Sequence, residues 1–350
     1  MAYSRGYHSY RGRTPRWRIA VMVLLVIVIL AAIAVIALSR NIVYDEAGVP
    51  RLELPWQEEP TEELPEELPE EPLDLTIETP QEPQKTRSIR AFTLPVGELT
   101  LEGWESAWMD AAAVPEPAYN AAAVTLKDDT GRVYFDSTIA VSGSVKLAGD
   151  TAAAIAEINR EESGELVIAR LSCFHDPKAA NRDVEGMGLK NTGGYIFYDG
   201  NNSQWLDPAK PAAREYLCGI AKEAAELGFG EILLTDVSYP TEGKLDKIDY
   251  GEGEKNANLT AFLEEMRAAL EPYGVVLSIE VPEAVIAQGS DEDAGLMLAD
   301  IAPRVDRIYA PTAAAEVPAL TQAVRAVSQA AEFVPELTEA DSAAGSFLVS

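Results

Sequence analysis

The sequence from Ser88 to Ser350 predicts an α/β fold, a (β/α)8 barrel of the TIM type, and two observations indicate it. About eight short apolar runs alternate with helical patterns over about 260 residues, which is the size and rhythm of such a barrel. One helical pattern ends at Gly228 and is followed at once by an apolar run, which is half of a βαβ unit. The segments before Ser88 have a different composition and are treated separately.

The N-terminal segment predicts a membrane anchor. No charged residue occurs from Ile19 to Leu38, and about 20 apolar residues at about 1.5 Å each span a bilayer core of roughly 30 Å. Arginines precede this run and acids follow it, so we expect residues 1–18 to be a basic cytoplasmic tip and the chain beyond Arg40 to be extracellular. A cleaved signal peptide is the alternative, but its apolar core usually has only about 7–15 residues.

Residues 39–87 predict an acidic linker. The stretch from Trp56 to Gln84 is dominated by proline and glutamate, so it cannot bury a core and repels itself. We expect a disordered, extended stalk that lifts residues 88–350 away from the membrane.

Composition excludes several function classes. The net charge is -29 and no basic patch occurs outside the N-terminal tip, so nucleic acid is not an expected partner. The only histidines are His8 and His175, which argues against a histidine-rich zinc site, and no cofactor or metal is expected. Without a Gly-x-Ser-x-Gly motif a Ser/His/Asp hydrolase has little support. Cys173 and Cys218 are expected to be unpaired, with a disulfide as the alternative.

The elements of the barrel are predicted from apolar periodicity. The expected strands are residues 89–94, 121–126, 166–172, 232–235, 275–279, 307–309, 333–334 and 347–349. The expected helices are residues 101–112, 152–159, 212–227, 259–270, 294–301 and 317–330. In the first of these helices Trp104 and Trp108 are four residues apart, which predicts one buried face.

The last units of the barrel are predicted to be irregular or truncated. Between Leu337 and Gly345 there is barely room for one helical turn. An open doubly wound sheet is the alternative fold, but no Gly-x-Gly-x-x-Gly motif follows the first strand.

Two acids at neighbouring strand ends are the candidate catalytic residues. Asp236 directly follows an apolar strand and Glu280 follows the next one, and active sites of such barrels lie at the carboxyl ends of the strands. A pair of carboxylates can cleave a glycosidic bond, one protonating the leaving oxygen and the other attacking the anomeric carbon or activating water. The alternatives are that Asp236 only caps the following segment and that Glu280 is a solvated loop acid.

Further residues around the strand ends, together with Trp205 in the long loop, are candidate substrate-binding residues: Lys127, Asp128, Arg170, Asp176, Trp205, Tyr239 and Tyr309. Several of them have structural alternatives. Lys127 and Asp128 begin a sequence typical of a turn, Trp205 could pack the long loop instead of a sugar ring, and Arg170 is expected to pair with Asp128 or Asp236.

Several ordered blocks resemble the bacterial putative glycoside hydrolase domain family, exported barrel proteins distantly similar to α-amylase-type enzymes. The resemblance covers roughly residues 88–312. It rests on Val124-Thr125-Leu126-Lys127-Asp128-Asp129-Thr130-Gly131, Ala169-Arg170-Leu171-Ser172-Cys173-Phe174-His175-Asp176-Pro177, Trp205-Leu206-Asp207-Pro208 and the segment from Ala221 to Pro240. It implies a carbohydrate-directed barrel with Asp236 at its centre.

The chain also departs from the family pattern. Thr235 and Ser238 stand where the family usually has an aspartate–tyrosine context and an arginine, Glu280 stands where it usually has aspartate, and residues 307–312 keep little of its strand-six block. Two functions are therefore expected. The first is a membrane-anchored extracellular glycoside hydrolase acting on a polysaccharide or cell-wall glycan, and the second is an inactive barrel that binds glycan or a protein partner at the envelope.

Overall fold

The computed structural model describes residues 42–44, 50–52, 88–112, 119–141, 150–158, 165–251, 253–341 and 343–350. The chain divides into two units, Met1–Glu78 and Thr79–Ser350. In the first unit β1 (Ile42–Tyr44) pairs antiparallel with β2 (Pro50–Leu52), within the range for which the sequence predicted only a linker. The predicted tip, membrane helix and Pro/Glu stalk lie outside the described residues. Within the described ranges, no helix is long and apolar enough to cross a bilayer.

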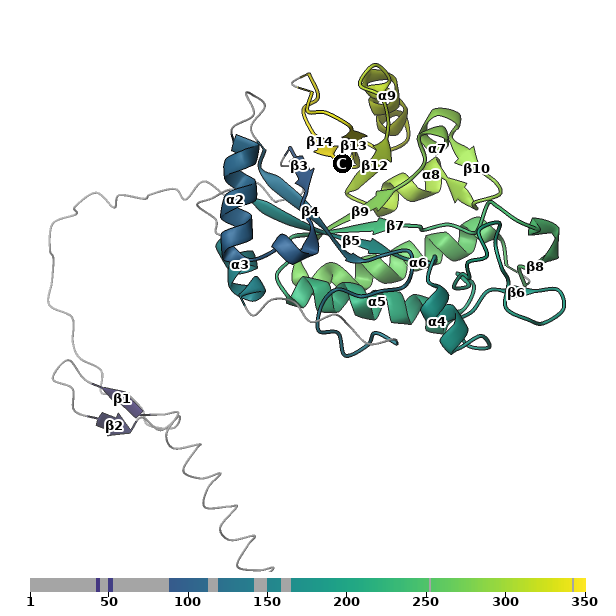
Figure 1. Cartoon of the computed structure of the whole chain (residues 1–350), viewed down its shortest axis with the longest axis horizontal. Coiled ribbons are helices and arrows are strands. Elements are labelled where there is room, and N and C mark those ends of the chain that lie inside the picture. The colour runs from purple at the N-terminus through teal and green to yellow at the C-terminus, as the bar shows by residue number, and fades with distance from the viewer. Residues whose placement is uncertain are drawn as a thin grey trace, which may run out of the picture. The chain divides into compact units, whose positions relative to one another are not determined.

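The second unit contains a closed barrel of eight parallel strands (Figure 1). Each strand pairs with its neighbours in chain order, and pairing of Leu348 with Ala91 closes the ring, so the predicted barrel is confirmed. The strands are β3 (Arg90–Thr93), β4 (Ala121–Lys127), β5 (Leu166–Ser172), β7 (Glu231–Thr235), β9 (Val276–Glu280), β12 (Arg307–Pro311), β13 (Glu332–Leu337) and β14 (Phe347–Val349).

Helices alternate with most of these strands, as the periodicity predicted. They are α2 (Leu101–Ala112), α3 (Thr151–Ile158), α4 (Pro177–Arg182), α5 (Pro211–Glu226), α6 (Lys255–Leu270), α7 (Glu283–Gln288), α8 (Leu298–Ile301) and α9 (Val317–Val327). The short helices α4 and α7 were not predicted, and the expected helix over 294–301 begins only at Leu298 because β11 (Leu296–Met297) precedes it. The described residues between β13 and β14 contain no helix, which confirms the irregular last unit.

Local sequence explains where the long helix α5 begins and ends. Pro211 occupies its first turn, where a missing N–H costs nothing. Gly228 follows its end with φ of +102°, a conformation that glycine adopts without steric cost. The chain therefore leaves α5 and enters β7 within five residues.

Two apolar layers hold the barrel together. The outer layer packs helices on the sheet and includes the predicted apolar face of α2, where Trp104 is buried, Trp108 is half-buried and their rings stack at 4.9 Å. The inner layer fills the barrel with small and branched side chains and one tyrosine: Ile89, Ala91, Ala121, Ala123, Leu166, Ile168, Leu233, Tyr309, Val334 and Leu348. Both cysteines are buried and free, and burial raises the pKa of the Cys218 thiol to about 12.

A polar network closes the end of the barrel where the strands begin. Arg307 donates to Glu231 at 2.6 Å and to Glu332 at 3.0 Å. Ser278 also donates to Glu231, at 2.6 Å. Arg307 and Glu231 are fully buried, so each charge depends on the other groups of the network.

Tyr309 belongs to this network, which corrects its predicted place at the substrate rim. Its side chain is fully buried and its hydroxyl donates to Glu231 at 2.8 Å. Burial, and then the Glu231 carboxylate, raise the pKa of Tyr309 well above its ordinary value. The reason is strand alternation: Tyr309 points to the same interior as Arg307, two residues earlier.

Replacing Arg307 with methionine should destabilise the barrel by about 3–5 kcal/mol, because Glu231 would be left buried without its cation. Arg304→Met is the matched control, because Arg304 forms a partly exposed pair with Glu264 and its loss should cost less than about 1 kcal/mol. The free energy of unfolding from urea titration of the full chain in detergent measures both. Equal effects of the two changes would contradict the importance of the network, and adding Glu231→Gln to Arg307→Met should restore part of the loss.

Candidate active site

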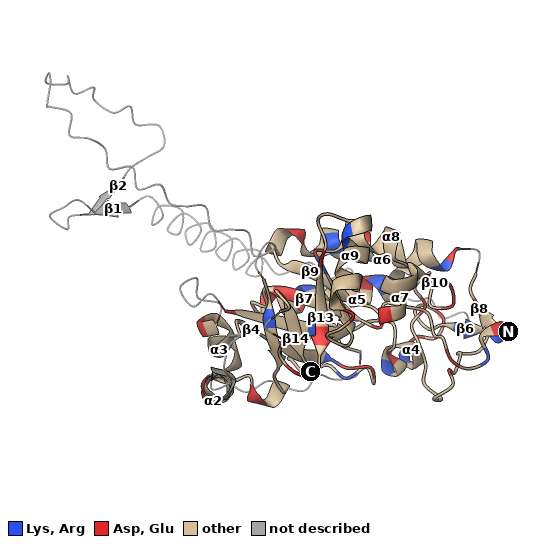
Figure 2. Ribbon diagram, turned by 90° about the horizontal axis from the view of Figure 1, so that it is seen from above, with Lys and Arg blue, Asp and Glu red and all other residues tan. Residues whose placement is uncertain are grey.

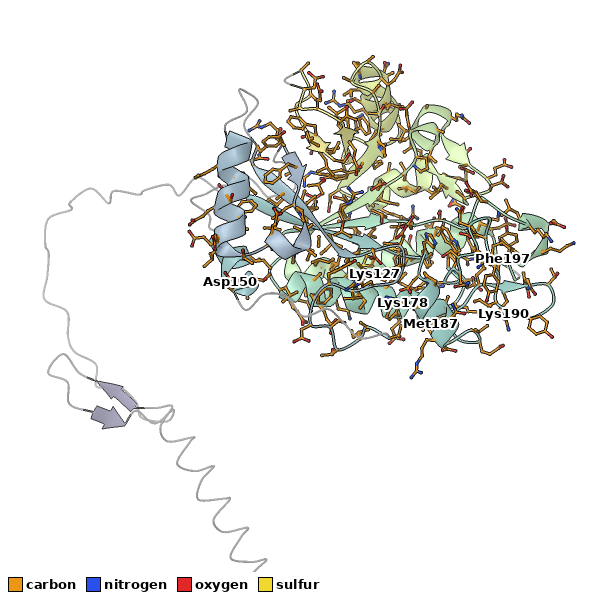
Figure 3. All side chains as sticks on the ribbon, in the orientation of Figure 1. Lys127, Asp150, Lys178, Met187, Lys190 and Phe197 are labelled. Atoms are coloured by element: carbon orange, nitrogen blue, oxygen red, sulfur yellow. The ribbon has the colours of Figure 1, made fainter. Side chains whose placement is uncertain are left out.

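The loops that follow β5, β7 and β9 carry short elements of their own and gather at one end of the barrel (Figure 1). They carry α4, the antiparallel pair of β6 (Lys190–Asn191) with β8 (Ile248–Asp249), and the pair of β10 (Ser290–Asp291) with β11. Figure 3 marks Lys178, Met187, Lys190 and Phe197 along the loop after β5. This is the end at which parallel strands finish, where barrel active sites lie.

Asp236 follows β7 in a constrained conformation. Its φ is +51°, in the left-handed region that few residues other than glycine, asparagine and aspartate adopt. Its Oδ2 accepts hydrogen bonds from the hydroxyls of Ser172 at 2.6 Å and Thr235 at 3.3 Å. The side chain is half-buried, so a fixed carboxylate remains accessible at the mouth of the barrel.

Glu280 ends β9, the strand beside β7, and its side chain is 23% exposed. It forms an ion pair with Nη2 of Arg170, which reaches it from the interior face of β5. Since Asp236 and Glu280 stand at the same end of neighbouring strands, the sequence prediction that they share one rim is confirmed.

The predicted partners of Arg170 were wrong. Arg170 contacts Glu280 and, at 3.5 Å, Glu336 of β13, instead of Asp128 or Asp236. Asp128 accepts a hydrogen bond from Thr130 of its own turn, and Asp236 accepts one from Ser172. Arg170 points into the barrel as Glu280 and Glu336 do, and only the closed ring brings these three strands face to face.

Glu336 is a candidate site residue that the sequence prediction missed. The expected strand stopped at Val334, but β13 continues to Leu337, and two residues of alternation place Glu336 on the interior face. Its side chain is only 4% exposed. Burial raises its pKa, Arg170 lowers it and Glu280 raises it, which together bring the pKa to about 7.

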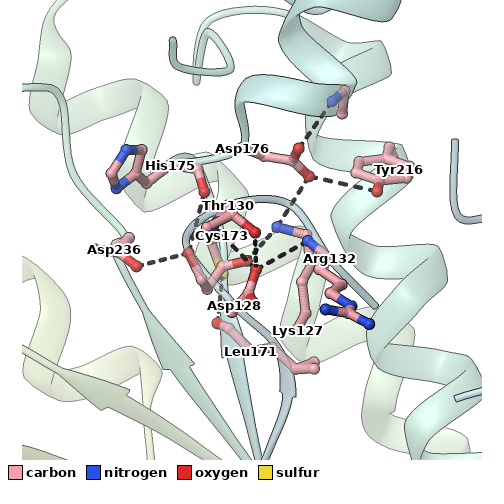
Figure 4. A network of polar contacts seen from close by, with 12 residues as sticks. Lys127, Asp128, Thr130, Arg132, Leu171, Cys173, His175, Asp176, Tyr216 and Asp236 are labelled. Atoms are coloured by element: carbon pink, nitrogen blue, oxygen red, sulfur yellow. Dashed lines mark hydrogen bonds and ion pairs between the residues drawn. The ribbon is translucent and has the colours of Figure 1, made fainter. Parts of the chain in front are cut away.

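Lys127 and Asp176 form a fully buried ion pair at 3.0 Å, which corrects their predicted contact with substrate (Figure 4). Lys127 also donates to the carbonyl of Ser172 at 2.6 Å, and Asp176 caps α4 by accepting from the N–H of Ala179 at 2.8 Å. A register shift between Thr125 and Lys127 turns Lys127 away from the interior face of the barrel. Both charges therefore fasten the loops to the strands.

Asp128 organises the turn after β4. It accepts hydrogen bonds from the hydroxyls of Thr130 at 2.7 Å and Tyr134 at 2.8 Å, and from the N–H of Arg132 at 2.9 Å. Burial acts to raise its pKa, but these hydrogen bonds outweigh burial and lower it. The turn expected at this position is present, and a role of Asp128 in binding stays a prediction.

Trp205 packs the long loop, one of the two interpretations open from the sequence. Its indole stacks on the ring of His175 with centroids 4.5 Å apart, and its N–H donates to Asp199 at 2.9 Å. Because His175 covers one face and only 9% of the residue is exposed, Trp205 has little surface left for a sugar.

Tyr239 is fully buried, which corrects its predicted place in the substrate site. Its hydroxyl accepts a hydrogen bond from the side-chain amide of Asn258 at 2.9 Å, and burial raises its pKa. Tyr239 therefore joins the loop after β7 to α6. Within the described residues no group of three or more histidine, cysteine, aspartate or glutamate side chains is arranged to hold a metal ion.

The family model described as a putative glycosyl hydrolase domain matches residues 107–312, which confirms the resemblance of the sequence blocks. Similar solved structures include a hypothetical protein from Ruminiclostridium thermocellum, 29% identical, covering 54% of this chain and 96% of that one with a TM-score of 0.44. The glycoside hydrolase domain of PgaB (BpsB) from Bordetella bronchiseptica is 14% identical, covering 71% and 84% with a TM-score of 0.49. A GH20 exo-β-N-acetylglucosaminidase from Vibrio harveyi is 13% identical, and the match spans 72% of this chain but only 41% of that one, with a TM-score of 0.45. No curated protein matches the chain.

The pKa of Glu336 predicts how stability depends on pH. Because it rises from 4.5 to about 7 on folding, its contribution is full below about pH 4.5 and is lost as the pH rises to about 7. The change is on the order of 3 kcal/mol. Urea unfolding of Glu336→Gln should lack this loss between pH 5 and 8. Glu339→Gln, at an exposed position after the same strand, should retain it, and an unchanged pH dependence in Glu336→Gln would contradict the assignment.

Proposed function

Because the chain belongs to the putative glycosyl hydrolase domain family, we propose that its barrel hydrolyses a glycosidic bond of a polysaccharide, with Asp236 and Glu280 as the paired carboxylates. One observation carries the proposal: the two acids end neighbouring strands at one rim, and each is held by hydrogen-bonding groups from β5. Such fixed carboxylates cost little reorganisation when substrate binds.

The roles of the two acids follow from the chemistry of the bond. One carboxyl group gives its proton to the leaving oxygen while the bond to the anomeric carbon breaks. The other carboxylate either attacks that carbon, after which water releases the sugar, or takes a proton from the water that attacks. In both cases one water molecule is consumed and both carboxyl groups return to their starting states.

Charge limits the class of polysaccharide. Residues 88–350 contain 43 acidic and 19 basic residues, and the ribbon in Figure 2 marks acidic residues on many loops and helices of the barrel unit. An anionic glycan would be repelled by this surface. We therefore propose a neutral or positively charged polysaccharide, such as a cell-wall glycan, as the substrate.

The second candidate function is a barrel that binds glycan or a protein partner without turnover. The departures from the family pattern at Thr235, Ser238 and Glu280 favour it, because altered strand ends can leave a barrel that binds a ligand without turnover. The two functions differ in whether ligand is released unchanged.

Asp236→Asn should lower the rate of hydrolysis by at least about 100-fold while the fold stays intact. Asparagine tolerates the left-handed backbone and keeps the side-chain volume, so the change removes mainly the charge. Reducing-sugar release from a broad glycan panel measures the rate, and thermal unfolding measures the fold. Asp129→Asn, in the exposed turn after β4, is the control and should retain activity.

The hydrolase proposal fails if the wild-type chain releases no sugar from any glycan of the panel. Binding that is measurable by calorimetry, without turnover and indifferent to Asp236→Asn, would support the second function instead.

We also propose that the apolar run Ile19–Leu38 anchors the chain in the cell membrane, with residues 1–18 in the cytoplasm and the barrel outside. The full chain should stay in the membrane pellet after an alkaline wash. Protease added to intact cells should cut the Pro/Glu segment and release a fragment of the size of residues 88–350. A chain found only in the soluble fraction contradicts the anchor, and a secreted chain lacking its first residues indicates a cleaved signal peptide.

A further inference from the structure

Arg170 is shared unequally between two glutamates. Its Nη2 forms the ion pair with Glu280 and lies 3.5 Å from Oε1 of Glu336, a distance too long for a good hydrogen bond. Among the described residues, this Oε1 is buried and has no hydrogen-bond partner. A buried acceptor without a donor is costly, so the observed arrangement favours a protonated, neutral Glu336.

Exposure decides which glutamate gains more from Arg170. The side chain of Glu280 is 23% exposed and water can solvate it, whereas that of Glu336 is 4% exposed. An ionised Glu336 would have only Arg170 of β5 as a countercharge, and it would face the like charge of Glu280 from β9. Ionisation of Glu336 should therefore draw the guanidinium away from Glu280.

We propose that Glu336 is a positioning residue for the hydrolysis: it competes with Glu280 for Arg170 and so sets how firmly Glu280 is held at the mouth of the barrel. The inference rests on the proposed function, because it requires Glu280 to act on the substrate. Glu336 itself is nearly closed to solvent, so it acts through Arg170 and needs no contact with the sugar.

The competition gives hydrolysis a defined dependence on pH. Below about pH 7 Glu336 is neutral and Arg170 holds Glu280; above it the ionised Glu336 takes the guanidinium. The value of kcat/KM should then fall about tenfold for each pH unit above this point, as the neutral fraction falls.

The first test is the pH profile of kcat/KM for the full chain. In Glu336→Gln the amide cannot ionise, so the fall at high pH should move up by at least about one pH unit, whatever the absolute rate. Glu339→Gln should keep the wild-type profile. An unmoved profile in Glu336→Gln overturns the proposal, and loss of hydrolysis at every pH in a folded variant does so too, because Glu336 would then act on the substrate directly.

The second test needs no turnover. Infrared difference spectra of the full chain in detergent should show one protonated carboxyl group that titrates near pH 7 and is absent from Glu336→Gln. Its midpoint should fall in Glu280→Gln, which removes the like charge, and rise in Arg170→Gln, which removes the cation. A midpoint unmoved in both variants refutes the sharing of Arg170, whereas absence of sugar release by the wild-type chain refutes the hydrolase proposal.

Discussion

At each end of the barrel interior, one arginine is shared between two glutamates. At the end where the strands begin, Arg307 bridges Glu231 and Glu332, and at the mouth Arg170 contacts Glu280 and Glu336. Strand β13 supplies one glutamate to each end, because Glu332 and Glu336 are four residues apart and a strand returns to the same face every two residues. The apolar inner layer separates the two clusters.

The two clusters differ in how well their charges are satisfied. In the buried cluster, Tyr309 and Ser278 add hydrogen bonds to Glu231, so the charge is surrounded by donors. At the mouth, Oε1 of Glu336 lacks a hydrogen-bond donor among the described residues, and Arg170 is 18% exposed. A network whose members are all hydrogen-bonded rigidifies a fold, whereas a buried polar group without a partner is costly and gains from a new one. The first suits a structural role, and the second suits a site that must respond to a ligand.

The loops around the mouth depend on a third buried contact, between Lys127 and Asp176. This pair joins the end of β4 to the start of α4, and Gly131 passes so close that an added Cβ would lie 2.0 Å from Oδ1 of Asp176. Ser172 connects the pair to the candidate site, since its carbonyl accepts from Lys127 and its hydroxyl donates to Asp236. Lys127 and Asp176, which the sequence predicted to contact substrate, thus hold the backbone that positions Asp236.

The sequence by itself determined the eight strands, most of the helices and the placement of Asp236 and Glu280 at one rim, because apolar periodicity and strand ends are local features of the chain. Only the tertiary structure decided which charges meet. Arg170 lies 110 residues from Glu280 in the chain, and its partner depends on barrel closure and on strand register. A single register shift turned Lys127 away from the interior. Strand β13 continues beyond Val334, where the expected strand stopped, and so places Glu336 on the interior face. These outcomes follow from pairing between distant strands, in which a change of one residue reverses the face that a side chain occupies.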